Sequence, residues 1–245
     1  YISKAAKLVP VTQTIMCPRL VSNKNDVSGS IVLSKYTFSL QKNIKDVFQI
    51  DPPFDITDYD TKHSTEYFGL PENKLIVGSF GNNRRENSHF MKIVRSYKNN
   101  DVHFVIKTNK KYKYLFGRKR ITTINRSLSE NEKLSLIRCF DIFLYPTSNE
   151  SYGLVFLEAM SQYVPIISYA DSAIPEVIGD GGLLAPLNNI KKMMELLDDL
   201  TTNDNKRRSI GQVGYKLFRK RNDPKLIAKK YEVFFEEILG KQERI

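Results

Sequence analysis

The sequence predicts an α/β fold in which a parallel β-sheet carries helices on both of its faces. Short, continuously apolar segments alternate with segments of helical periodicity along most of the 245 residues. Continuous apolar runs, as opposed to alternating ones, are typical of strands that are buried on both faces. Polar loops containing glycine follow three of these runs, at the end of the strand where sheets of this class bind ligands.

The expected strands share a short apolar run, and they lie at residues 7–16, 29–34, 46–59, 74–81, 102–108, 141–146 and 164–169. The second half of the segment 46–59 contains two prolines and reads as a linker. The expected helices share apolar residues three or four positions apart, and they lie at residues 89–98, 129–140, 190–200, 206–221 and 223–245 and around Glu158. Ser129 and Glu132 have the spacing of a capping box, which predicts a helix start there.

The formal net charge of +11 implies an anionic partner, which can be a nucleic acid, an anionic membrane surface or a phosphorylated small molecule. Two basic clusters, residues 110–120 and 206–221, supply much of this charge. We interpret both as solvated surface, because no nucleic-acid-binding motif accompanies them. No apolar run approaches the roughly 18 residues of a membrane span. Cys17 and Cys139 form no metal-ligand or disulfide pattern, which favours the reducing cytoplasm.

Three polar loops are expected to meet at one crevice, because each follows a strand of the same parallel sheet. The first, GNNRREN, turns at Gly81 and then presents Arg84 and Arg85; the other two read TSNESYGLVFLE and ADSAIPEVIGDGG. A helix that begins near Gly153 points unpaired backbone N–H groups into the crevice, which favours an anion such as phosphate. The two arginines supply the opposite wall.

Two glutamates flank this anion site. Glu158 stands among apolar residues of the helix, where a lone carboxylate is costly, about 7.5 Å along the axis from Gly153. A nucleotide with its phosphates at the helix start has its ribose at that reach, and Glu150 lies on the other side of the phosphates. The pair suits a diphosphate with a hydroxyl-rich group at each end. The alternatives are a salt-bridged helix carboxylate for Glu158 and an ordinary loop residue for Glu150.

The stretch PTSNESYGLVFLEAM resembles the Glu–seven–Glu motif of retaining glycosyltransferases with the GT-B fold. The order of residues 128–186 follows this family for almost sixty positions, residues 66–81 resemble its entry into the donor domain, and residues 207–218 resemble its closing helix. The resemblance covers about residues 30–240. It implies Rossmann-like domains that face each other across a cleft.

The resemblance also implies residue roles. Glu150 would contact the donor sugar, and with Arg84 and Arg85 it forms the expected catalytic group. The loop GNNRREN is shorter than the family's common form. The expected donor-binding residues are the ribose acceptor Glu158, the diphosphate-binding Gly153, Leu154 and Val155, and Gly81, Ser151 and Tyr152.

For the domains, the resemblance implies that residues 1–60 are the remnant of an N-terminal acceptor domain with the linker. Residues 61–222 would bind the donor, and residues 223–245 would form a helix that packs back toward the first domain. Met16 stands where the family often has a histidine. Because only a remnant of the acceptor domain is implied, we expect the chain to bind donor but to transfer little sugar by itself.

The implied reaction is transfer of a hexose from a nucleotide-diphosphate sugar to an acceptor hydroxyl, with retention of anomeric configuration. The acceptor is a glycan, a lipid or a protein, and peripheral membrane contact is a further expected interaction. We expect no cofactor, no metal and no nucleic acid, and interpret the Asp-Tyr-Asp at 58–60 as linker. A nucleotide-sugar epimerase and a non-catalytic basic module that binds nucleic acid are the alternatives.

Overall fold

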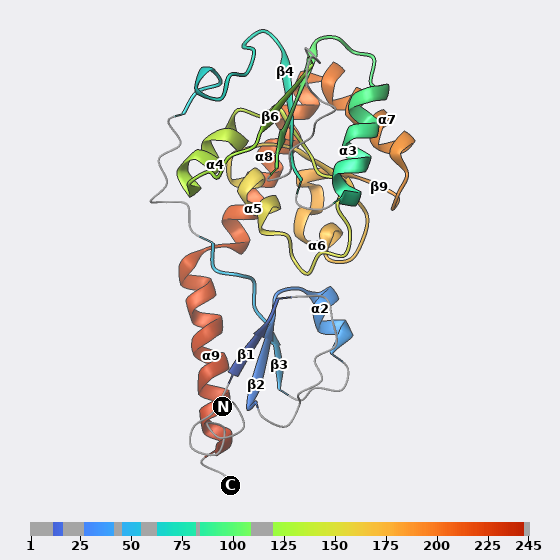
Figure 1. Ribbon diagram of the computed structural model, residues 1–245. Helices are drawn as coiled ribbons and strands as arrows, with labels where there is room; N and C mark the ends of the chain where they lie inside the picture. Colours follow the sequence, from blue (N-terminus) through green and yellow to red (C-terminus); the bar gives the residue numbers. More distant parts are fainter. Residues whose placement is uncertain are drawn as a thin grey trace.

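The computed structural model describes residues 12–16, 27–41, 46–54, 63–81, 84–108 and 120–242, without the side chains of residues 84–87 and 241–242. It contains two parallel sheets, which lie one below the other in Figure 1. The smaller sheet has the order β1-β2-β3, and the larger has the order β6-β5-β4-β7-β8-β9. Every pair of neighbouring strands in both sheets is parallel.

The strand bounds follow the predicted apolar runs closely. The smaller sheet consists of β1 (Thr12–Ile15), β2 (Gly29–Val32) and β3 (Val47–Gln49). The larger consists of β4 (Leu75–Phe80), β5 (Val102–Lys107), β6 (Ile121–Ile124), β7 (Ile142–Leu144), β8 (Ile166–Tyr169) and β9 (Gly182–Ala185).

The continuous apolar strands are explained by burial on both faces of the larger sheet. In β7, Phe143 packs into the core on one face, while Ile142 and Leu144 pack into the core on the other. The same alternation places Val105 of β5 on the first face and Phe104 on the second. Because side chains alternate along a strand, a strand covered on both sides needs apolar residues at every position.

Helices cover both faces of the larger sheet (Figure 1). One face carries α3 (Arg84–Ser96) and α7 (Ile190–Thr202). The other face carries α4 (Glu130–Arg138), α5 (Leu154–Ser161), α6 (Ile174–Ile178) and α8 (Asp204–Arg221). Short 3₁₀ turns occur at η1 (Glu66–Phe68) and η3 (Gly179–Gly181). The predicted capping box of Ser129 and Glu132 at the start of α4 is confirmed.

The smaller sheet packs against the C-terminal helix, α9 (Pro224–Gln242), which runs alongside it (Figure 1). Phe234 and Ile238 of α9 form a hydrophobic core with Ile31 of β2 and with Ile50, the residue after β3. Phe48 meets Phe234 edge-on with ring centroids 5.0 Å apart. A short helix, α2 (Lys35–Leu40), follows β2. The helix α9 therefore packs against the smaller sheet, and the assignment of that sheet to an acceptor domain stays a prediction.

The structure confirms the predicted parallel sheet with helices on both faces, and corrects three local expectations. The predicted polar loop after β8 contains α6, η3 and β9, because Pro175 starts a helix too short to show periodicity. The helix predicted at residues 89–98 begins at Arg84. The strand β6 was not expected, since its sequence ITTI places two half-buried threonines between the isoleucines.

Two predicted features lie outside the described residues: the Asp-Tyr-Asp at 58–60 and residues 110–119 of the first basic cluster. The second basic cluster lies in α8, whose buried positions are Gly211, Gly214 and Phe218. Over the described ranges, no helix combines the length and the apolar character needed to span a membrane.

Candidate functional site

The strand order of the larger sheet reverses between β4 and β7. From β4 the chain proceeds outward through β5 to β6, and from β7 it proceeds the other way through β8 to β9. Ligands of open α/β sheets bind at such a switch point, beyond the carboxyl ends of the strands. The three predicted loops follow β4, β7 and β8, which are adjacent strands. All three loops therefore leave the carboxyl edge of the larger sheet, which faces the smaller sheet in Figure 1.

The loops after β7 and β8 are tied together by hydrogen bonds. The backbone N–H of Asn149 donates to the Asp171 carboxylate at 2.7 Å, and that of Glu150 donates to Ser172 Oγ at 2.8 Å. Asn149 and Ser172 both have positive φ, at 62° and 50°. Left-handed backbone at non-glycine residues is uncommon and is held only where the surroundings fix it. These contacts give the loop that carries Glu150 a defined conformation.

The start of α5 is built to leave backbone donors open. Its N-cap is Gly153, with φ 84° and no side-chain cap. A Cβ at Gly153 would lie 2.6 Å from the ring of Phe156, so both the backbone angle and the space require glycine. The first N–H groups of a helix have no intrahelical partner, and glycine offers no side chain to bind them. The N–H groups of Leu154 and Val155, in the first turn, therefore have no acceptor within the helix, and their predicted contact with a diphosphate stays a prediction.

Glu158 is buried in α5, and its charge is paired. Its Oε1 lies 2.9 Å from Lys133 Nζ of α4, and the same ammonium lies 2.5 Å from Oε2 of Glu130. Burial raises the pKa of the Glu158 carboxyl, and the positive charge of Lys133 opposes that rise. The salt-bridged alternative is thus present in the structure. No local pattern in the sequence points to Lys133, because the pairing joins two helices.

Glu150 lies in the loop between β7 and α5 and is half-buried. Its Oε1 accepts a hydrogen bond of 3.0 Å from Thr147 Oγ1, and Thr147 is fully buried. Its backbone carbonyl accepts from the N–H of Ala173 at 3.3 Å. Glu150 is therefore oriented by both loops, which suits a residue that must present a carboxylate to a ligand.

Ser151 and Tyr152 reach toward the smaller sheet. Ser151 Oγ donates to the carbonyl of Met16 at 2.6 Å, directly after β1. The hydroxyl of Tyr152 donates to Asp51 at 3.2 Å, and its side chain is only 2% exposed. Both side chains thus contact the residues that we assigned to the acceptor domain. Their predicted contact with the donor stays a prediction. The contacts that are observed connect the loop before α5 to the residues that follow β1 and β3.

The loop after β4 supplies the remaining predicted residues. Gly81 is buried, and its N–H donates to the carbonyl of Lys107 at 2.9 Å, extending the β4–β5 ladder. Arg84 and Arg85 form the first turn of α3. Their side chains lie outside the described residues, so their predicted contact with the diphosphate stays a prediction. Lys107 ends β5 at the same edge, and burial lowers the pKa of its ammonium.

Sequence reasoning assigned no role to Glu176, and the structure gives it one. Its carboxylate accepts from the backbone N–H groups of Lys35 at 2.8 Å and Tyr36 at 3.1 Å. These are the first residues of α2, so Glu176 of the larger unit caps a helix of the smaller one. Lys230 of α9 pairs with Asp51, two residues after the end of β3, at 2.9 Å.

Among the described residues, no group of three or more His, Cys, Asp or Glu could hold a metal.

Residues 69–217, more than half of the chain, match the family Glycosyl transferases group 1. This chain belongs to that family. The matched range of this group 1 glycosyltransferase includes all six strands of the larger sheet and the loop from Thr147 to Gly153. The predicted family is therefore confirmed.

Known relatives and structures agree with this membership. An uncharacterised glycosyltransferase of Methanocaldococcus jannaschii is 30% identical over 119 residues, which cover 48% of this chain and 31% of that protein. Anabaena HepE in complex with UDP and glucose superposes with a TM-score of 0.75 at 13% identity, covering 93% of this chain and 71% of that one. The pneumococcal O-GlcNAc transferase GtfA in complex with UDP and GlcNAc gives 0.73 at 12% identity, covering 97% and 54%. The structural likeness shows the GT-B fold. The chain spans about a third of its archaeal relative.

Proposed function

We propose that this group 1 glycosyltransferase binds a nucleotide-diphosphate sugar at the switch point between β4 and β7. The observation that carries the proposal is the uncapped start of α5 at Gly153, followed about 7.5 Å further along the helix by the buried carboxylate of Glu158. An anion site and a hydroxyl acceptor on one rigid helix match the phosphate and ribose of a nucleotide. UDP in two structures of similar fold supports this choice of ligand.

In the proposed complex the diphosphate lies over the N–H groups of Gly153, Leu154 and Val155. Backbone donors at a helix start bind anions without a charged side chain, and the helix dipole adds to the attraction. Arg84 and Arg85, in the first turn of α3, provide charge from the other side of the switch point. Together they would stabilise the negative charge of the departing diphosphate, with no metal or other cofactor in the proposed mechanism.

The two ends of the diphosphate then meet the two glutamates. Glu158 accepts from the ribose hydroxyls on the helix side. Glu150, which Thr147 and the β8 loop hold in place, accepts from hydroxyls of the sugar. The sugar is a hexose in this proposal, and its transfer to an acceptor hydroxyl retains the anomeric configuration. The departing diphosphate assists the acceptor on the same face, so the proposal needs no protein nucleophile.

The proposal assigns the donor and the acceptor to the two predicted domains. Residues 61–222 bind the donor, residues 1–60 belong to an acceptor domain, and residues 223–245 connect back to it. Group 1 membership favours this reading over an epimerase or a nucleic-acid-binding module. A glycan, lipid or protein acceptor, contact with a membrane surface and a cytoplasmic location complete the proposal. Because catalysis needs both substrates in one geometry, we expect little transfer by these 245 residues alone.

The proposal is tested by thermal shift and calorimetry with UDP, GDP and ADP, the matching monophosphates, and a random DNA duplex. A ligand that binds only the folded state raises the melting temperature in proportion to the logarithm of its concentration above Kd. We expect at least one nucleoside diphosphate to stabilise the chain more than its monophosphate does. Salt-sensitive binding of the duplex, with no response to any diphosphate or diphosphate sugar, would overturn the proposal.

A further inference from the structure

The only described cation that pairs with Glu158 comes from a different helix. Lys133 of α4 lies between two carboxylates: its ammonium is 2.9 Å from Oε1 of Glu158 and 2.5 Å from Oε2 of Glu130. The Glu158 side chain is 8% exposed, the Lys133 side chain 23% and the Glu130 side chain 59%. Glu130 is three residues before Lys133 on the same helix. The lysine is therefore anchored from its own helix and reaches inward to one buried acceptor.

This contact uses only one oxygen of Glu158. Among the hydrogen bonds and ion pairs of the described residues, Lys133 binds Oε1 and none involves Oε2. A contact at one oxygen restrains the rotation of the carboxylate, and so it also restrains the direction of the second oxygen. A ribose diol needs an acceptor that is both charged and oriented, because a protonated carboxyl offers fewer lone pairs and presents an O–H instead.

The charge of Glu158 depends on Lys133. Burial raises the pKa of the Glu158 carboxyl, Lys133 lowers it, and the like charge of Glu130 raises it further. α8 and β8 also pack against α5, but the charges that act on Glu158 are those of Lys133 and Glu130 on α4. Burial lowers the pKa of the Lys133 ammonium, but its two carboxylate partners outweigh that effect and the pKa is raised. Lys133 therefore carries its charge at neutral pH.

We propose that Lys133 is a positioning residue for ribose recognition, which keeps Glu158 ionised and turns its free oxygen toward the ribose hydroxyls. This inference rests on the proposed function of Glu158. Lys133 itself does not touch the nucleotide in this scheme. It acts on the carboxylate, so its removal should alter how binding depends on pH and on the 2′-hydroxyl, and not only how tightly the nucleotide binds.

The direction of the pH effect follows from the carboxyl. Binding requires the ionised form of Glu158, so affinity falls as pH falls through its pKa. Lys133→Met removes the one neighbour that lowers this pKa, so the loss begins at a higher pH in the variant than in the wild type. Lys133→Arg keeps the charge and should keep the wild-type profile. Lys133→Gln keeps a donor without the charge, and it replaces the methionine variant if that protein does not fold.

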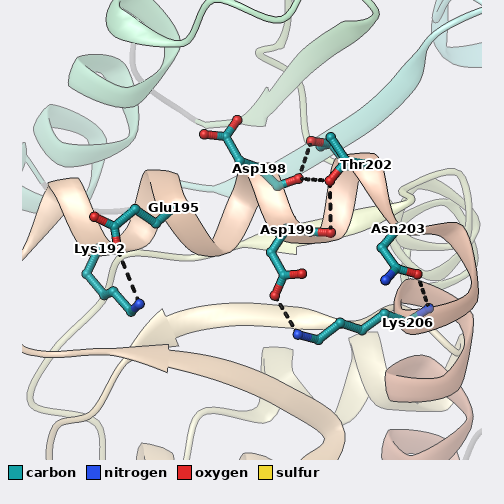
Figure 2. A network of polar contacts seen from close by, with 8 residues as sticks. Lys192, Glu195, Asp198, Asp199, Thr202, Asn203 and Lys206 are labelled. Atoms are coloured by element: carbon teal, nitrogen blue, oxygen red, sulfur yellow. Dashed lines mark hydrogen bonds and ion pairs between the residues drawn. The ribbon is translucent and has the colours of Figure 1, made fainter.

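A matched control is available on the other face of the sheet. Lys192 of α7 pairs with Glu195 three residues later at 3.2 Å, as Figure 2 shows. Both side chains of this pair are about half exposed, and α7 belongs to the face opposite α4 and α5. Lys192→Met therefore removes a lysine from the same kind of helical pair, at a position without a proposed role in binding.

The experiment measures the affinity of UDP and 2′-deoxy-UDP, with GDP and 2′-deoxy-GDP as a second pair, from about pH 5 to about pH 8, because the pKa of the Glu158 carboxyl is raised. We expect the wild type and the Lys133→Arg and Lys192→Met variants to prefer the ribonucleotide by roughly tenfold, the worth of one charge-assisted hydrogen bond. In Lys133→Met the preference should shrink to about twofold at the acid end of this range and recover partly as pH rises.

Two failures can be told apart. If Glu158→Gln abolishes the ribose preference and folded Lys133→Met retains it at every pH, the inference about Lys133 is wrong and the role of Glu158 stands. If the wild type binds nucleotide without preferring ribose, or binds no nucleotide at all, the proposed role of Glu158 is wrong and the inference falls with it.

Discussion

Oε1 of Glu176 accepts a hydrogen bond of 2.8 Å from the backbone N–H of Lys35, which joins α6 of the larger unit to the start of α2 in the smaller one. Oε2 accepts from the next N–H, that of Tyr36, at 3.1 Å. Ser34 already caps α2 from within its own unit, by accepting from Thr37. Glu176 thus satisfies further donors of the same helix from across the junction.

Replacing Glu176 with alanine should loosen this junction. The loss of a carboxylate cap costs about 1–2 kcal/mol of local stability, because the two N–H groups of α2 lose their partner. Hydrogen exchange by mass spectrometry should show faster exchange of the α2 amides, with the strands of the larger sheet unchanged. Glu195→Ala, on the exposed face of α7, is the control. Unchanged exchange at Lys35 and Tyr36 would contradict the cap.

Glu150→Ala should separate the sugar from the nucleotide. The Glu150 side chain is held by Thr147 on the sugar side of the proposed diphosphate site, so its removal leaves the α5 N-terminus intact. We expect nearly unchanged affinity for the nucleoside diphosphate and weaker affinity for the intact nucleotide sugar, measured by calorimetry. Equal losses for both ligands would place Glu150 elsewhere in the site.

Gly153→Ala should impair both stability and binding. The residue has φ 84°, and an added Cβ would meet the Phe156 ring at 2.6 Å. A strained non-glycine residue of this kind costs of the order of 1–3 kcal/mol, and relief of the clash would move the N–H groups of the first turn. Urea unfolding and diphosphate titration measure the two effects. Gly240→Ala, in α9 where no atom lies within 4 Å of the added Cβ, should not lower stability and should leave binding unchanged.

Arg84 and Arg85 should set the preference for diphosphate over monophosphate. Each added phosphate charge gains a guanidinium partner, so the double change to alanine should bring the two affinities close together. The measurement is the ratio of UDP to UMP affinity at one salt concentration, because screening alters both. If the double variant still prefers UDP to UMP, another cation binds the diphosphate, and Lys107 at the end of β5 is the next candidate.

The parts that could be predicted from sequence depend on local signals. Phe143 and its neighbours in β7 are apolar at every position, which reveals a strand buried on both faces. Gly153 before an apolar helix, with glutamates on both sides, reveals the candidate site. Lys133 and Glu176 gave no such signal, because their partners lie on other elements. In the sequence, each is indistinguishable from a solvent-exposed charge on a helix. The contact of Lys133 with Glu158 forms because α4 packs on α5, and that of Glu176 with Lys35 forms because α6 lies against α2.

We propose above that the buried carboxylate of Glu158 accepts from the ribose of a nucleotide whose diphosphate lies at the start of α5. Its most direct test is calorimetric titration of wild type and Glu158→Gln with the nucleoside diphosphate that binds best. The substitution keeps the size of the side chain and removes its charge, so the fold should persist. We expect a loss of about 1.5–3 kcal/mol in binding free energy, the range for a hydrogen bond to a charged group. Unchanged affinity in a folded Glu158→Gln protein would contradict it.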